Sequence, residues 1–194
     1  MKQHITHVCK SAFMHLRNIR YLKPYLSADA LATVAHAFIT SRIDYCNSLL
    51  VGIPDVCVSQ LQRIQNCTAR LITNTRKYDH IQPVLKRLHW LPVKQRITFK
   101  LLLITYKAVH GLAPQYICEL VQMKQSGREL RSTNQYLLQI PKTRLKTYGD
   151  AAFSVAGPTK WNRLPGHIRL APTIECFKSK LKTYLFDIAF KLID

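Results

Sequence analysis

The residues whose types are suited to chemistry are few in this chain. Asp44, Tyr45 and Cys46 form a cluster of an acid, an aromatic ring and a thiol. A cysteine nucleophile needs a neighbouring base, and none stands at a workable spacing from Cys46. The apolar residues around Cys46 predict a core position instead, with Asp44 either a partner of Arg42 or a charge on a helix surface. We therefore expect no catalytic residues.

A metal site is the next possibility, because His4, His7 and Cys9 are zinc-ligand types close together. Their spacing matches no paired-ligand pattern, and no second pair follows. The sequence also lacks a glycine-rich phosphate loop, a Gly-x-Ser-x-Gly elbow and a His-Glu-x-x-His pair. Its 10 acids are dispersed, so spacing places no two carboxylates together. We expect helix surface and core here, with no metal or cofactor, and the chain by itself is predicted not to be an enzyme.

The charge balance is unusual. The 194 residues hold 29 Lys and Arg against 10 Asp and Glu, a net charge of +19. Between Asp79 and Glu119 there is no acid, while six cations accumulate: Lys86, Arg87, Lys94, Arg96, Lys100 and Lys107. Such an excess attracts a polyanion, most simply nucleic acid. The alternative is a solvated basic surface whose charge is incidental.

The spacing of apolar residues predicts a helical hairpin over residues 27–77, around which the fold is organised. Ser27 is the expected N-cap of its first helix, which should end at Gly52, and Pro54 should open the second. The expected core face of the first helix is Leu31, Val34, Ala35, Phe38, Ile39, Cys46 and Leu49. That of the second is Cys57, Val58, Leu61, Ile64, Thr68, Leu71 and Ile72. A buried Phe38 predicts a cost of about 3 to 5 kcal/mol for Phe38→Ala.

Further helices are expected on either side of the hairpin. The first spans residues 1–22, with Ile5, Val8, Ala12, Phe13, Leu16 and Ile19 as its apolar stripe. A short helix capped by Asp79 follows the hairpin, and a longer, mostly buried helix runs from Pro92 to about His110. Pro114 begins another short one.

The C-terminal part is less regular. The polar stretch 122–135 reads as a mobile loop that separates a helical part, 1–121, from a smaller part, 136–194. Tyr136–Ile140 and Arg144–Tyr148 predict short strands or extended segments. Pro158 should open a single helical turn in which Trp161 packs against the last helix, capped by Thr173. The expected fold class is mainly α: a helical bundle with a small C-terminal part of extended segments and a terminal amphipathic helix.

The six cysteines and the apolar runs bear on location. Three cysteines fall on expected apolar helix faces, and no signal sequence is visible, which favours a reduced, intracellular chain. The longest aliphatic block is Leu101 to Ile104, far short of the roughly 20 residues that span a bilayer. We expect a soluble protein with no membrane partner.

Several long blocks resemble one family. HAFITSRIDYCNSLL, LQRIQNCTARLIT and YDHIQPVLKRLHWLPVKQRITFKLLLITYKAVHGLAP look like the region after the polymerase palm in LINE-type, jockey-like non-LTR retrotransposon reverse transcriptases. RLKTYGDAAFSVAGPTKWNRLP and FKSKLKTYLF continue the likeness, which covers nearly all of the chain. In that family an RNA-directed DNA polymerase uses adjacent metal-binding aspartates in its palm, and this sequence has no Asp-Asp pair. Met1 falls inside the similar region, so the resemblance implies a fragment without the active site.

The resemblance implies a thumb-like body that holds a template–primer duplex by its phosphates. The duplex would be RNA, DNA or a hybrid, bound without sequence specificity, and the palm of the parent protein is a further expected partner. The candidate nucleic-acid-binding residues are Arg63, Arg70, Arg76, Lys77, Lys94, Arg96, Lys100, Arg144 and Lys146. The alternative function is a helical protein-interaction or structural module. Only the first function predicts binding to unrelated duplexes that weakens steeply with salt.

Overall fold

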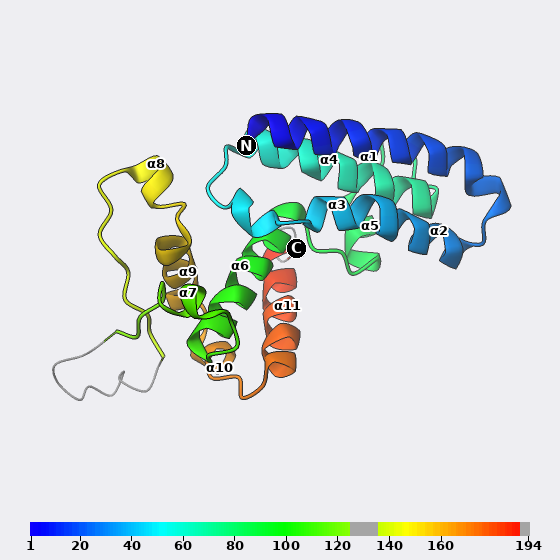
Figure 1. Ribbon diagram of the computed structural model, residues 1–194. Coiled ribbons are helices and arrows are strands. Elements are labelled where there is room, and N and C mark those ends of the chain that lie inside the picture. The colour runs from blue at the N-terminus through cyan, green and yellow to red at the C-terminus, as the bar shows by residue number, and fades with distance from the viewer. Residues whose placement is uncertain (125–135, 191–194) are drawn as a thin grey trace. The chain divides into compact units, whose positions relative to one another are not determined.

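The computed structural model describes residues 1–124 and 136–190, which are mainly α-helical as expected (Figure 1). Contacts divide the chain into one unit of Met1–Ile97, joined by the described residues from Ile188 on, and a second unit of Thr98–Asp187. The division falls inside α6 (Val93–Val109) and not at the predicted loop 122–135, of which residues 125–135 lie outside the described part. The reason is that α6 carries apolar residues on nearly all sides, so its first turns join one core and the rest join another.

In the first unit, α1 (Lys2–Leu22) lies alongside α4 (Asp55–Thr73), as the blue and cyan ribbons of Figure 1 show. The two helices are parallel, because Lys23, just past α1, bonds the Leu71 carbonyl near the end of α4. The segment that connects them returns through α2 (Ala28–Ala35) and α3 (Ser41–Asp44), which Figure 1 shows below the pair. The core they share includes Ile5, Ala12, Ile19, Leu31, Ile39, Ile43, Leu61 and Ile64.

The first helix of the predicted hairpin begins as expected and then departs from its period. Ser27 Oγ accepts a hydrogen bond from the Ala30 amide at 3.2 Å, which confirms the N-cap. After α2 the helix widens into a π-turn over His36–Thr40, in which the Ser41 amide bonds the His36 carbonyl. A wider turn aligns residues four apart, so the buried positions are Leu31, Ala35, Ile39 and Ile43. Phe38 is turned outward and is 48% exposed, so its predicted core position is wrong.

The predicted helix to Gly52 also ends early, at Asp44. Cys46 adopts a left-handed conformation (φ 50°) that no α-helix continues through, and a short 3-10 turn, η3 (Asn47–Leu50), follows it. Cys46 is exposed and Leu49 is 64% exposed, so both predicted core positions are wrong. Gly52 lies in the connecting loop with φ 77°.

The second helix of the hairpin matches its prediction. Pro54 immediately precedes α4, and Cys57, Leu61, Ile64 and Thr68 of the expected stripe are buried. Asn74, in the left-handed conformation (φ 56°), ends the helix.

The connection from α4 to α6 is held by side chains of α4. Gln65 Nε2 donates to the Leu91 carbonyl at 2.9 Å, and Gln62 Oε1 accepts from the Val93 amide at 2.8 Å. These bonds set where α6 begins. The short helix α5 (Gln82–Arg87) is not capped by Asp79 as predicted, because the Asp79 carboxylate accepts from the Arg76 amide instead.

The second unit is built on aromatic packing around α6. Trp161 of α9 (Phe153–Asn162) is fully buried and donates from Nε1 to the Tyr136 carbonyl at 2.7 Å, which confirms its predicted packing role. Tyr106 of α6 stacks on Phe177 of α11 (Ile174–Phe190) with ring centroids 4.3 Å apart. Thr173 caps α11 as predicted, since its hydroxyl accepts from the Cys176 amide.

Small elements complete this unit: α7 (Gln115–Cys118), α8 (Lys146–Gly149) and α10 (Gly166–Arg169). Of the two segments predicted as short strands or extended segments, neither forms a strand in the described residues. Leu138 makes a single antiparallel bridge to Met123, and α8 is one helical turn where the second strand was expected. The Leu138 amide donates to Asn162 Oδ1, and Asn162 Nδ2 donates to the Leu138 carbonyl. The Asn162 side chain thus makes the two hydrogen bonds that a neighbouring strand would make.

Proline and glycine lie inside α9, contrary to the prediction that Pro158 opens a helical turn. Gly157, the residue before Pro158, lies where α9 packs against α6. A Cβ atom at this position would lie 2.9 Å from Thr105 Oγ1 of α6. The absence of a side chain allows α9 to approach α6 closely, and this packing outweighs the hydrogen bond that Pro158 cannot make.

Candidate nucleic-acid interface

An open groove of about 1230 Å³ runs between α1 and α4 in the first unit. Its walls combine basic, polar and apolar side chains. The lining residues are Phe13, Leu16, Arg17, Arg20, Lys23, Ser59, Gln62, Arg63, Asn66, Cys67, Arg70, Leu71, Asn74, Thr75 and Lys77. Phe13, placed on the core stripe by the sequence, is 42% exposed and lines this groove instead.

The groove is strongly positive. Among its described lining residues, α1 and its exit contribute Arg17, Arg20 and Lys23, α4 and its exit contribute Arg63, Arg70 and Lys77, and none is acidic. A concave surface with one sign of charge concentrates the field and raises the local concentration of anions. The sequence of each helix provides one row of cations. The parallel packing of α1 and α4 then places the two rows opposite one another in the same groove.

Helix geometry explains why the cations lie in the groove. Arg17 and Arg20 are three residues apart, which places them on one flank of α1 beside the buried Leu16 and Ile19. Arg63 and Arg70 are seven residues apart on α4, about two turns, and so share a face as well. The buried stripe of each helix packs into the core, and the flanking basic row borders the groove.

Two of the six cations have structural partners. Lys23 Nζ donates to the Leu71 carbonyl at 2.6 Å and to Asn74 Oδ1. Arg70 donates to the Arg76 carbonyl at 3.2 Å and to the Asp79 carbonyl at 2.8 Å. Carbonyls at the end of a helix carry partial negative charge and lack partners within the helix, so these cations stabilise the end of α4 and the turn beyond it.

The other cations are open to a ligand. Arg17, Arg20 and Arg63 are exposed and make no hydrogen bond or ion pair to any residue that the structure describes. Lys77 is exposed and lies over the ring of Tyr78, with Nζ 5.6 Å from the centroid. These four charges point to the part of the groove that can take up an anion.

The structure brings together three of the candidate residues chosen from sequence. Arg63, Arg70 and Lys77 line the groove, whereas Arg76, exposed just after α4, does not line it. The sequence analysis missed the contribution of α1. Its signal was the spacing of Arg17, Arg20 and Lys23 along one flank of a helix whose apolar stripe was already recognised.

Arg96 has a different role from the predicted one. Its Nε donates to Asp44 Oδ1 at 2.9 Å and its Nη2 to Asp44 Oδ2, with side chains 18% and 34% exposed. This two-bond pair joins α6 to α3, and a paired, half-buried guanidinium is not available to phosphate. Asp44 therefore has Arg96 as its partner, and the prediction of Arg42 is wrong.

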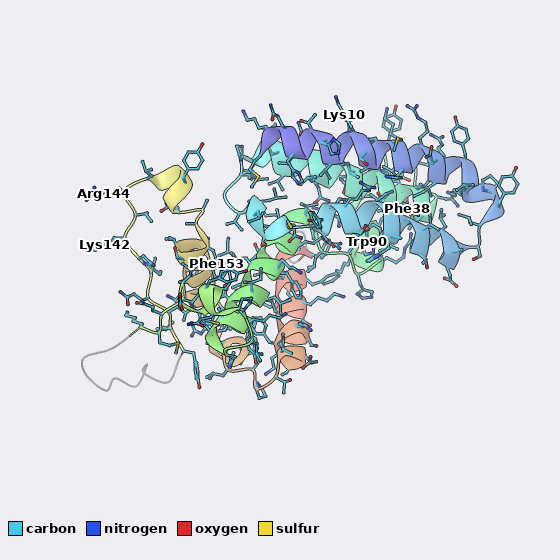
Figure 2. The ribbon with its side chains drawn as sticks, viewed as in Figure 1. Lys10, Phe38, Trp90, Lys142, Arg144 and Phe153 are labelled. Atoms are coloured by element: carbon cyan, nitrogen blue, oxygen red, sulfur yellow. The ribbon has the colours of Figure 1, made fainter. Side chains whose placement is uncertain are left out.

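The remaining candidates are not among the residues that line the groove. Lys94 Nζ is 3.7 Å from Asp55 Oδ1, and both side chains are largely exposed, a pairing of small energy. Lys100 and Arg144 belong to the second unit, where Figure 2 shows Arg144 with Lys142 on the segment before α8. The side chain of Lys146 lies outside the described residues.

The possible metal ligands and the thiol of Cys9 were the other candidates for chemistry in the sequence. No three His, Cys, Asp or Glu side chains of the described ranges stand close enough to hold a metal ion. Burial, with a smaller effect of Cys57, raises the pKa of the Cys9 thiol, as expected for a core thiol and not for a nucleophile. Within the same ranges, no helix has the length and apolar character needed to cross a bilayer.

Comparisons with family models, with curated proteins and with solved structures find no match to this chain. The functional conclusion therefore depends on the groove and on the chemistry of the residues that line it.

Proposed function

We propose that the groove between α1 and α4 binds the backbone phosphates of a nucleic-acid duplex without reading its sequence. The observation that carries this proposal is the convergence of six cations on one groove of the first unit, with no acid among the described residues that line it. Guanidinium groups suit this ligand because their planar N–H donors match two phosphate oxygens at once.

Phosphate contacts give affinity and position but no sequence preference. Binding neutralises phosphates and releases the cations condensed on the nucleic acid, so affinity falls as salt rises. The four cations with an open face, Arg17, Arg20, Arg63 and Lys77, are assigned to phosphate contact. Lys23 and Arg70 hold the end of α4 and contribute charge at longer range.

The biological setting that we propose is the non-catalytic C-terminal part of a LINE-type reverse transcriptase. The resemblance of the long sequence blocks supports it, and the natural ligand would then be a template–primer duplex. In that setting the palm of the parent polymerase, which would carry the paired aspartates, is the expected protein partner.

The test is a filter-binding salt titration with duplexes of unrelated sequence. About 0.9 unit of slope per phosphate contact predicts a plot of log affinity against log salt with a slope of about −4 to −5 for B-form DNA. A variant with Arg17, Arg20, Arg63 and Lys77 all changed to Gln should reduce that slope by about 3 to 4 units for every sequence.

The control variant carries the same loss of charge at Arg42, Lys86, Arg87 and Lys94, which are exposed in the first unit and do not line the groove. The control should keep most of the slope. Equal losses from both variants, or no binding at low salt, would contradict the proposal and leave a protein-interaction module as the better interpretation.

A further inference from the structure

Two cysteines lie on the packed stripes of α1 and α4. Both are free thiols in the structure. Cys57 is 6% exposed and belongs to the core of the first unit, and the partly buried Cys9 packs against that core. Cys9 comes four residues after Ile5 and three before Ala12, which are both buried, so it continues the buried stripe of α1. Cys57 is the first buried residue of the α4 stripe.

The register of the two helices places these cysteines at the same level. Near the ends of the helices, Lys23 bonds the carbonyl of Leu71, which stands 48 residues later in the chain. Cys57 follows Cys9 by the same number of residues. Parallel α-helices rise equally per residue, so a register that holds at one end of the pair also holds at the other. The two thiols therefore face each other between the first turns of α4 and the middle of α1.

Electrostatics gives a separate sign that the sulfur atoms are close. After burial, Cys57 is the second cause of the raised pKa of the Cys9 thiol. The effect of one such charge on another falls with distance, so it requires neighbouring groups.

The spacing of packed helices suits a covalent bond at this level. Helix axes pack about 8 to 10 Å apart and each Cα atom lies about 2.3 Å from its axis, so directly facing Cα atoms are about 4 to 6 Å apart. Disulfides join Cα atoms that are roughly 4.4 to 6.8 Å apart. The pair can thus be closed without separating α1 from α4.

We propose that Cys9 and Cys57 form an oxidation site, at which a hydroperoxide converts the two facing thiols into a disulfide between α1 and α4. With hydrogen peroxide, the Cys9 thiolate attacks one peroxide oxygen, the O–O bond breaks, and Cys9 becomes a sulfenic acid while one water is released. The sulfur of Cys57 then attacks the sulfenic sulfur, and the sulfenic hydroxyl leaves with the Cys57 proton as a second water. The two thiols together lose two electrons, which reduce the peroxide.

Burial assigns the order of these steps. Cys9 is the more accessible thiol and meets the oxidant, whereas Cys57 lies in the core and resolves the sulfenic acid. The raised pKa of the Cys9 thiol keeps it mostly neutral near pH 7, so the reaction is slow and requires sustained oxidant. The bond closes a long loop of the chain, which restricts the unfolded state and stabilises the first unit. This inference does not depend on the proposed binding of phosphate.

The experiment exposes the dilute natural chain to hydrogen peroxide, unfolds it and alkylates the remaining thiols with N-ethylmaleimide. Peptide mapping by mass spectrometry should find Cys9 joined to Cys57 within one chain. Reduction with dithiothreitol before alkylation should free both residues, since disulfide formation is reversible.

A second measurement uses a variant in which the other four cysteines are changed to Ala: Cys46, Cys67, Cys118 and Cys176. Peroxide should form the same bond in this variant and raise its urea midpoint by about 1 to 2 M, as expected for a crosslink that closes a long loop. The matched control adds Cys9→Ala to the variant, and its midpoint should not respond to peroxide.

The outcomes decide the proposal. Cys9 and Cys57 both alkylated after the exposed Cys46 has been oxidised would overturn it. A disulfide from Cys9 or Cys57 to another cysteine, or one formed only between two chains, would overturn it as well. Because the mapping uses the natural chain, it gives a result whether or not the variants fold.

Discussion

Neighbouring side chains in the first unit have opposite environments. Ile39 is fully buried in the core, whereas Phe38 is 48% exposed and contacts the ring of His15 at a centroid distance of 5.4 Å. Figure 2 shows Phe38 on the segment between α2 and α3. Both are large and apolar, so residue type does not separate them. The π-turn over His36–Thr40 does, because it rotates the helix face by about one residue.

This difference predicts unequal costs of truncation. Phe38→Ala should lower the free energy of unfolding by no more than about 1 kcal/mol, since an exposed side chain loses little burial and leaves no cavity. Ile39→Ala should lower it by about 2 to 5 kcal/mol, the usual cost of removing a buried aliphatic side chain. Urea denaturation followed by circular dichroism measures both. A larger loss for Phe38→Ala than for Ile39→Ala would mean that the buried face is misassigned.

At the scale of elements, the end of α3 decides how the chain reaches α4. Apolar periodicity alone predicts a helix through Leu49, but the backbone leaves the helix at Tyr45 and becomes left-handed at Cys46. The Asn47 side chain, buried at this bend, donates to Asp44 Oδ1 at 3.3 Å. Asp44 also receives Arg96 of α6, so tertiary contacts made by one carboxylate hold the helix end in place.

Substitutions at Cys46 distinguish a bend from a continuous helix. At a left-handed position glycine carries no strain, so Cys46→Gly should leave stability unchanged or raise it by up to about 1 kcal/mol. Cys46→Val should lower it by about 1 to 3 kcal/mol, because a branched side chain is strained there. In a continuous helix the order would be reversed, with Gly costing about 1 kcal/mol. Chemical unfolding of the two variants measures the sign.

At the scale of the whole molecule, each unit has its own core and α6 contributes to both. Val93 and Ile97 belong to the core of the first unit, while Tyr106 joins the aromatic cluster of the second. The net charge of +19 does not by itself locate a binding surface. The groove of the first unit gathers six cations with no acid among the described residues that line it. The candidate interface thus depends on the arrangement of charge in one unit and not on the total charge.

The whole chain is expected to bind nucleic acid without extending it. Primer extension with magnesium or manganese should give no product, because two-metal polymerisation needs closely placed carboxylates and the sequence has no adjacent aspartates. Asp44, the acid of the Asp44, Tyr45 and Cys46 cluster, is bonded to Arg96. Product formation that disappears in the Asp44→Asn variant would contradict this prediction.

The sequence by itself determined those features that depend on one helix at a time. The α4 stripe, the caps at Ser27 and Thr173 and the packing of Trp161 follow from local spacing and side-chain chemistry. A helix repeats every 3.6 residues, so its apolar and basic faces can be found from the sequence without knowing its neighbours. For this reason Arg63 and Arg70 were recognised as basic positions on one polar face.

The tertiary structure alone decided which helices meet and which charges remain open. Arg96 pairs with Asp44, 52 residues earlier, and so leaves the set of available cations, whereas Arg17 and Arg20 enter it because α1 lies parallel to α4. The π-turn and the left-handed Cys46 are likewise set by what the segment packs against. Periodicity describes the faces of each helix, but the pairing of faces depends on packing between residues distant in sequence, and that packing created the groove.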